Sequence, residues 1–262
     1  MAGDAGKIAL EASGVRKSFS KDGRSLAVLD VERFSVQDGE FVTVIGPSGC
    51  GKSTLLHIMG GFIQAEAGAI QVHGRRVNGP GPDRGMMFQE FALFPWKTVA
   101  GNVAWGLETQ GMSKSKIGEV VDRHLEMIGL GDFRDHYPAE LSGGMKQRVQ
   151  LARVLAIDPE VLLMDEPFGA LDAQTRESMQ EELTRLWERT GKTIVFVTHD
   201  IDEAVYLGDR VVVLSARPGR IREEVKIDLP RPRGLEIKKS AKCHEYRNQI
   251  WDLIRSESGA IR

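Results

Sequence analysis

The stretch GPSGCGKST, residues 46–54, decides the fold of this chain. It carries Gly46, Gly51, Lys52 and Ser53 at the spacing G-x-x-x-x-G-K-[ST], after an apolar segment and before a helix-forming one. Glycines let a chain wrap closely around an anion, so that successive backbone N–H groups point at phosphate oxygens. A helix that starts directly after the loop adds the positive end of its dipole. The stretch therefore predicts a phosphate-binding loop between a strand and a helix.

This loop supplies most of the predicted nucleotide contacts. Lys52 is expected to reach the β- and γ-phosphates of a nucleotide, and the Ser53 hydroxyl is expected to bind Mg²⁺. The other positions are expected to surround the phosphates. The predicted nucleotide-binding residues of the loop are Gly46, Pro47, Ser48, Gly49, Cys50, Gly51, Lys52, Ser53 and Thr54.

Composition sets limits on the class of protein. The chain has 262 residues, of which 41% are hydrophobic and 27% charged, as in ordinary globular proteins. The net charge of −2 provides no basic field that would favour nucleic acid, so no nucleic-acid partner is expected. Two cysteines are too few for a disulfide framework, which predicts a reduced, cytoplasmic protein. No secretory signal is evident, and no apolar stretch approaches the ~20 residues that span a bilayer.

Strand-like and helix-like segments alternate along the chain. Residues 7–13 and 28–36 read as strands, and QDGE at 37–40 reads as a hairpin turn after the second. Continuous apolar runs, beginning with FVTVIG at 41–46, are typical of central parallel strands. Residues 97–157 have helical character, and within them one helical face is predicted to be apolar, with Ser113 as the candidate N-cap: Ile117, Val120, Val121, Leu125 and Ile128. The pattern predicts an α/β fold with a parallel sheet core, an N-terminal antiparallel β part and an inserted helical subdomain.

The segment VLLMDEP, residues 161–167, supplies a second candidate group. Its four apolar residues predict a buried strand with Asp165 at the carboxyl end, where such sheets place ligand groups. Asp165 is expected to hold Mg²⁺, directly or through water. Glu166 is placed to orient or deprotonate a water molecule. Alone, these two residues before a proline would more often form a cap or turn, but a phosphate loop on the same sheet favours the catalytic interpretation.

The segment LSGGMKQR, residues 141–148, completes the pattern. Ser142, Gly143 and Gly144 begin a helix with exposed N–H groups, which predicts a second anion site. In isolation a Ser-capped helix would explain it equally well. Together with the two preceding motifs, and in the same order, it resembles the signature of ATP-binding cassette (ABC) ATPases over about residues 7–230.

The resemblance assigns further residues. It implies that Gln89 contacts Mg²⁺ or the attacking water and links to the helical subdomain, and that His199 touches the γ-phosphate. It also implies that Asp172 belongs to the segment called the D-loop and that Phe19 stacks on adenine, although an aromatic residue near a strand is more often part of the core. Met145 stands where the family usually has Gln in LSGGQ, which removes one amide from the ribose side of the site.

The resemblance also implies an assembly. In this family the signature of one subunit faces the phosphate loop of another, so two copies are expected to enclose two ATP. The division expected along the chain is an ATPase domain of a RecA-like type at 1–230, with its helical subdomain at about 90–157, and a short basic C-terminal helix at 231–262. That last segment is expected to be a solvated amphipathic helix, with a membrane-surface role as the alternative.

Three segments resemble the importer branch that serves nitrate, taurine and alkanesulfonates: GPGPDRGMMFQ at 79–89, LFPWKTVAGNV at 93–103 and DLPRPR at 228–233. This implies two integral membrane permease subunits, a periplasmic or extracellular substrate-binding protein, and a peripheral position on the cytoplasmic face of the inner membrane. Two alternatives are a soluble regulatory or repair ABC ATPase and an ABC ATPase that extracts lipids. The compact subdomain between Gln89 and Leu141 leaves no room for the coiled coils of chromosome-organising relatives.

Overall fold

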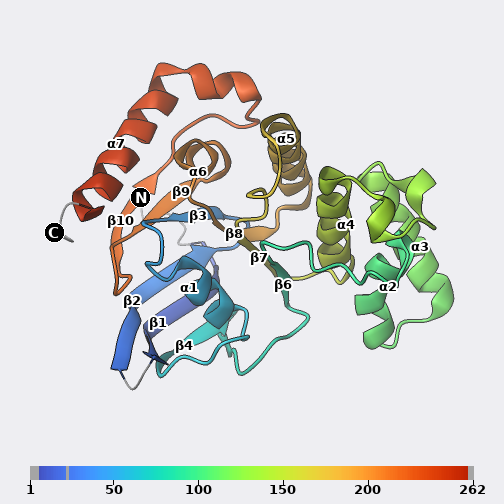
Figure 1. The fold of residues 1–262 in the computed structure, drawn as a ribbon, viewed down its shortest axis with the longest axis horizontal. Coiled ribbons are helices and arrows are strands. Elements are labelled where there is room, and N and C mark those ends of the chain that lie inside the picture. Colours follow the sequence, from blue (N-terminus) through green and yellow to red (C-terminus); the bar gives the residue numbers. More distant parts are fainter. Residues whose placement is uncertain (1–5, 22–23, 259–262) are drawn as a thin grey trace.

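Two sheets and a group of helices make up the computed structural model, which describes residues 6–21 and 24–258 (Figure 1). One sheet has four strands in the order β2-β1-β4-β5 and the other six in the order β10-β9-β3-β8-β7-β6. The strands of the first are β1 (Ile8–Lys21), β2 (Arg24–Gln37), β4 (Ala67–Val72) and β5 (Arg75–Arg76). Those of the second are β3 (Phe41–Ile45), β6 (Arg84–Met87), β7 (Val161–Asp165), β8 (Thr193–Val197), β9 (Arg210–Leu214) and β10 (Ile221–Lys226).

Helices occupy both faces and one side of this frame. They are α1 (Lys52–Met59), α2 (Val99–Thr109), α3 (Lys114–Met127), α4 (Gly143–Ala156), α5 (Ala173–Thr190), α6 (Ile201–Leu207) and α7 (Ala241–Ser258). Three short 3₁₀ helices join them: η1 (Gly131–Phe133), η2 (Pro138–Glu140) and η3 (Leu235–Lys239). The prediction of an α/β fold with a parallel core, an antiparallel N-terminal part and an inserted helical part is confirmed.

The six-stranded sheet is parallel except at one edge. Strand β3 pairs in parallel with β8 and β9, and β7 pairs in parallel with β6 and β8. Every residue of β3, β7 and β8 is buried, as their continuous apolar runs predicted for strands covered on both faces. Strand β10 pairs antiparallel with β9 at the edge. Parallel pairing brings the carboxyl ends of β3, β7 and β8 to the same side of the sheet, where the candidate site lies.

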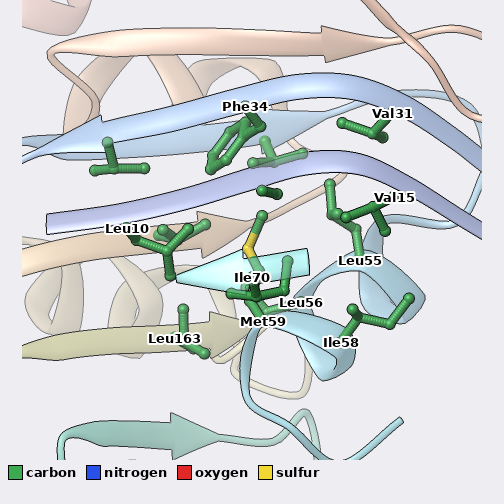
Figure 2. Packing of buried hydrophobic residues seen from close by; sticks show 14 of the residues in the cluster. Leu10, Val15, Val31, Phe34, Leu55, Leu56, Ile58, Met59, Ile70 and Leu163 are labelled. Atoms are coloured by element: carbon green, nitrogen blue, oxygen red, sulfur yellow. The ribbon is translucent and has the colours of Figure 1, made fainter. Parts of the chain in front are cut away.

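The main core lies between the two sheets (Figure 2). Phe34 of β2 and Leu10 of β1 face Leu55 and Met59 of α1, and Leu163 of β7 closes the other side. All five side chains are at most 1% exposed. Burial of these side chains holds α1, and the loop at residues 46–54 before it, in a fixed position. Burying side chains of this size stabilises the fold by about 1.5–3 kcal/mol each.

The turn at QDGE does not form a hairpin, so that part of the prediction was wrong. A turn is present, and the Glu40 amide donates to the Gln37 carbonyl at 3.1 Å. Strand β2 before it pairs with β1, however, while β3 after it pairs with β8 and β9. The chain passes from one sheet to the other here. A turn sequence specifies a change of direction, but the buried faces of the strands decide which neighbour each one pairs with.

Helices α2, α3 and α4 form a helical lobe with a hydrophobic cluster of its own (Figure 1). The helical face predicted from the sequence is confirmed: Val121, Leu125 and Ile128 are buried, and Ile117 and Val120 pack against the same cluster. Ser113 occupies the N-cap position of α3, as expected, without a side-chain capping bond.

The C-terminal segment packs against the sheet. Helix α7 buries Cys243 and Ile250 in a cluster with α6, β9 and β10. Before it, Arg233 is 4% exposed, and its guanidinium donates to backbone carbonyls at the carboxyl end of α6, including Gly208 O at 2.8 Å. Only one face of α7 is therefore solvated. Within the described part of the chain, no helix combines the length and apolarity needed to cross a membrane.

Candidate functional site

The loop 46–54 joins the end of β3 to the start of α1, as predicted. Gly51 caps α1 with φ of 106°, a conformation that residues with side chains avoid. At Gly46, a Cβ atom would lie 2.8 Å from the carbonyl oxygen of Leu214 on β9. Two of the glycines are thus required by backbone geometry and close packing. They leave the first amides of α1, which have no partner within the helix, available to an anion.

Lys52 and Ser53 start α1 and point in different directions. The Lys52 ammonium is curled into the loop, where it donates to the carbonyls of Gly46 at 2.9 Å and Pro47 at 3.2 Å. The side chain is 7% exposed, so the positive charge is held next to the loop amides. Ser53 Oγ donates to Asp165 Oδ1 at 2.9 Å, which joins the loop to the end of β7.

Asp165 and Ser53 offer two adjacent hard oxygen donors. Burial raises the pKa of the Asp165 carboxyl, while the hydrogen bond from Ser53 and the nearby His57 ring oppose that rise. His57 Nε2 lies 3.4 Å from Asp165 Oδ2. Mg²⁺ prefers oxygen ligands and keeps several waters or phosphate oxygens, so this pair fits that ion beside a triphosphate.

Glu166 follows β7 in a left-handed backbone conformation, with φ of 43°. That region costs a residue with a side chain on the order of 1–3 kcal/mol and is concentrated at functional sites. Its Oε2 lies 2.8 Å from Nδ1 of His199, which follows β8. A Cβ atom on Gly169 would lie 3.9 Å from both Glu166 Oε2 and Gln89 Nε2. The three predicted catalytic side chains therefore come from three neighbouring strands and meet at one place.

A cavity of about 380 Å³ lies over the loop. Its lining includes eight of the predicted residues: Phe19, Ser48, Gly49, Gly51, Lys52, Ser53, Thr54 and Glu166. Phe19 is 42% exposed, with Lys17 Nζ 5.3 Å from its ring centre, so it belongs to the cavity wall and not to the core. Cys50 differs from its neighbours. Its thiol is buried, and burial raises the pKa of that thiol, so the side chain packs under the loop and does not face the cavity.

Sequence reasoning missed two parts of this wall. Arg217, after β9, lines the cavity and donates from Nε to the Gly49 carbonyl at 3.1 Å. Leu26 and Val28 of β2 line it beside Phe19. No motif marks Arg217, because its contact depends on the parallel pairing of β9 with β3. It adds a second positive charge beside the loop.

The predicted second anion site lies elsewhere in the chain. None of residues 142–144 lines the cavity over the loop. Ser142 caps α4 and accepts from the Met145 amide at 3.3 Å, while Asp172 caps α5 and accepts from the Thr175 amide at 3.0 Å. Hydrogen bonding from Thr175 lowers the pKa of Asp172. The two helix starts adjoin, since a Cβ on Gly144 would lie 2.7 Å from Thr175 Cγ2.

The connection from β6 to the helical lobe is held by α4. Gln150 Nε2 donates to the carbonyls of Phe88 at 3.2 Å and Glu90 at 3.3 Å, on either side of Gln89. Arg153 donates to Ala92 O at 2.8 Å. Gln150 and Arg153 were also missed, because their helix pattern shows only which side chains are buried. They fix the position of Gln89 relative to the lobe.

The family model described as ABC transporter matches residues 29–169, which is more than half of the chain. The chain belongs to the ABC transporter family. This cassette is 46% identical over 252 residues to the nitrate import ATP-binding protein NrtD of Synechocystis, covering 94% of this chain and 95% of that protein. It is 47% identical to the taurine import ATP-binding protein TauB of Ruegeria pomeroyi, covering 89% and 88%. It is 46% identical to the aliphatic sulfonates import ATP-binding protein SsuB of Bacillus cereus, covering 95% and 96%.

A solved structure shows the same cassette fold. The ATP-binding cassette MJ0796, described as a dimer in a post-hydrolysis state bound to ADP and Pi, matches with a TM-score of 0.74. It is 33% identical, and the match covers 84% of this chain and all of that one. As an ABC cassette, the protein binds ATP and is an ATPase. The cavity over the loop is lined by the buried Lys52 and by Glu166, and Asp165 adjoins it through Ser53, so this part of the chain suits that chemistry.

Proposed function

We propose that this cassette is the ATP-hydrolysing subunit of an importer for a small anion such as nitrate, taurine or an alkanesulfonate. The observation that carries the proposal is its similarity, over nearly the full length of both chains, to ATP-binding proteins named for the import of these compounds. The compound itself is selected by other subunits, because no site for it is expected on the ATPase.

The geometry supports the following proposed roles for the site residues. The loop amides, Lys52 and Arg217 hold the phosphates, and Phe19 stacks on adenine. Ser53, Asp165 and Gln89 are the proposed Mg²⁺ ligands, Asp165 directly or through water; the ion would supply positive charge that stabilises the transferring phosphoryl group.

Hydrolysis needs a group that accepts a proton from water. Glu166 is proposed as this general base, because it lines the cavity over the loop and has a carboxylate oxygen 2.8 Å from His199 Nδ1. His199 holds that carboxylate in place and presents its other ring nitrogen toward the γ-phosphate position. Gln89 orients the water from the opposite side.

A second subunit is proposed to complete each site. Ser142, Gly143 and Gly144 expose the start of α4 away from the cavity of their own chain, so an anion bound there comes from another copy. The similarity to a dimeric cassette supports two identical subunits that enclose two ATP. In this arrangement Asp172, which adjoins the start of α4, also lies at the subunit interface. We propose the same chain division as before, with 1–230 as the ATPase domain, about 90–157 as its helical subdomain and 231–262 as a C-terminal extension.

Permease subunits are proposed to bind an aromatic groove between the sheet and the helical lobe, defined by Phe62, Phe88, Phe94, Trp105 and Arg153. It has a volume of about 300 Å³. The rings of Phe62 and Phe88 stand 5.4 Å apart, and those of Phe94 and Trp105 stand 5.0 Å apart. Trp105 is 43% exposed and Trp96 nearby is 72% exposed. Exposed aromatic surface of this kind suits an amphipathic helix of a partner.

The test is purification of the complex from its own cells. A tagged chain is expected to bring down two integral membrane permease subunits from detergent extracts, as a peripheral protein of the cytoplasmic face would. A periplasmic or extracellular binding protein is expected to be needed for uptake of the anion by reconstituted vesicles. Trp105→Glu should abolish co-purification with ATP binding intact, whereas Trp251→Glu, on the exposed face of α7, should not.

The same experiment separates the alternatives. Absence of integral membrane subunits, together with hydrolysis stimulated by DNA, would contradict an importer and favour a soluble ATPase. A permease that removes lipids from vesicles would favour the lipid-extracting class.

A further inference from the structure

A line of polar side chains runs from the C-terminal segment to the loop that carries His199. Lys238 on η3 donates from Nζ to Gln180 Oε1 on α5 at 2.8 Å. Gln180 Nε2 donates to Glu203 Oε1 on α6 at 2.9 Å. The other oxygen of Glu203 accepts from Thr198 Oγ1 at 2.5 Å. The line therefore ends one residue before His199, and it joins four separate segments of the chain.

In each hydrogen bond of this line, only one of the two groups can be the donor. An ammonium group only donates and a carboxylate only accepts, so the Gln180 amide must turn its oxygen to Lys238 and its nitrogen to Glu203. Gln180, Glu203 and Thr198 are 3%, 5% and 2% exposed, so water does not replace a missing partner easily. Removing the ammonium leaves the Gln180 oxygen unpaired and frees the amide to turn, which disturbs the next link.

The Thr198 end of the line shapes the loop around His199. Thr198 Oγ1 accepts from the Asp200 amide at 3.0 Å, and Asp200 Oδ1 accepts from the Glu203 amide at 3.1 Å. The same Glu203 residue thus anchors the loop through its side chain and through its backbone. One small cavity is lined by Thr198 and Glu203 together with Glu166 and His199. The line reaches the place where the hydrolytic groups meet.

We propose that Lys238, Gln180, Glu203 and Thr198 are positioning residues that hold the His199 loop, so that the segment after β10 sets the rate of ATP hydrolysis. None of the four lines the cavity over the phosphate-binding loop, so they act through His199 and not on the nucleotide. The inference rests on the proposed role of His199 beside Glu166. It means that the C-terminal extension affects the rate of hydrolysis, although Lys238 contacts α5 and does not line the cavity over the loop.

Lys238→Met tests the inference with little risk to folding, because the side chain is only half-buried and its stem can still pack near the Tyr206 ring, 4.8 Å from Nζ. We expect kcat for ATP hydrolysis in the intact chain to fall about three- to tenfold, in the lower part of the range of coupling between neighbouring groups, with KM for ATP unchanged. Lys238→Arg keeps a donor for Gln180 and should restore most of the rate. Lys239→Met changes an exposed lysine of the same 3₁₀ helix and is the matched control.

Two further measurements identify the route. Thr198→Val removes the hydroxyl at the other end with little change of shape, and should lower kcat by a similar factor that does not multiply with that of Lys238→Met. Amide hydrogen exchange of residues 198–203 should quicken in Lys238→Met but not in Lys239→Met.

The results that contradict the inference are distinct from those that contradict the proposed function. If Lys238→Met matched Lys239→Met in kcat, and faster exchange stayed within residues 235–258, the line would be merely structural and this inference would be wrong. If His199→Ala hydrolysed ATP at the normal rate, the proposed role of His199 would fail, and this inference with it.

Discussion

Replacing Glu166 by Gln separates ATP binding from ATP hydrolysis. The amide has the shape of the carboxylate, and its oxygen can still accept from His199 Nδ1, which lies 2.8 Å from Glu166 Oε2 in the native protein. The proposed phosphate contacts come from the loop, Lys52 and Arg217, which the change leaves alone. What is lost is a group that accepts a proton.

The size of the effect follows from that single loss. General bases contribute about 10²–10⁴-fold, so the barrier should rise by roughly 3–5 kcal/mol. Steady-state phosphate release should fall by that factor, while the dissociation constant for ATP, measured by equilibrium binding, should stay within about twofold, because uniform binding is retained. With hydrolysis blocked, size-exclusion chromatography in ATP and Mg²⁺ should show a long-lived dimer.

The control is Glu188→Gln, an exposed carboxylate on α5, which should leave all three measurements unchanged. Normal turnover by Glu166→Gln would remove Glu166 from its proposed role. A loss of ATP affinity equal to the loss of rate would show instead that the residue binds the ground state, and the assignment of the general base would have to move to another group.

Three other changes test separate parts of the structure. Lys52→Ala should weaken ATP binding about 10- to 100-fold, as expected for a charge-assisted contact worth roughly 1.5–3 kcal/mol, and unchanged affinity in a nucleotide titration would contradict the phosphate-loop assignment. Ile250→Ala should lower the free energy of unfolding, measured by urea denaturation, by about 2–5 kcal/mol, because this side chain of α7 is fully buried against the rest of the fold. A change below 1 kcal/mol would mean that α7 does not unfold together with the domain. Cys50 should react with a maleimide far more slowly in the folded protein than in urea, because burial removes access and raises the pKa of its thiol; equal rates would show that the loop opens freely.

Local patterns predicted most of the fold because they agree with its packing. The apolar runs of β3, β7 and β8 specified buried parallel strands, and the 3.6-residue pattern of α3 specified its inner face. The hairpin at QDGE failed because pairing partners are chosen over long distances. Strand β10 went unpredicted for a related reason: at the edge of a sheet its sequence IREEVK keeps one fully buried residue, Val225, too little to give a strand pattern.

For the site, the sequence predicted those residues that lie within motifs. The loop, Asp165 and Glu166 each follow a recognisable strand, and the fold brings them together with His199 and Gln89. Arg217 was missed because its contact with Gly49 spans 168 residues and depends on the sheet order. The chain of contacts from Lys238 was missed for the same reason, since each link joins side chains whose spacing in sequence carries no period.

The shared hydrophobic cluster of α2, α3 and α4 connects the aromatic groove to the start of α4 through packed side chains. Trp105, at the aromatic groove, and Ser142, at the start of α4, both belong to this lobe. Gln150 of α4 joins the lobe to the backbone on either side of Gln89. In the proposed assembly, a permease bound at the groove and the nucleotide of a neighbouring copy bound at Ser142 would both contact this lobe. If each binding event favours the same position of the lobe, then by linkage each would alter the affinity for the other by an equal factor.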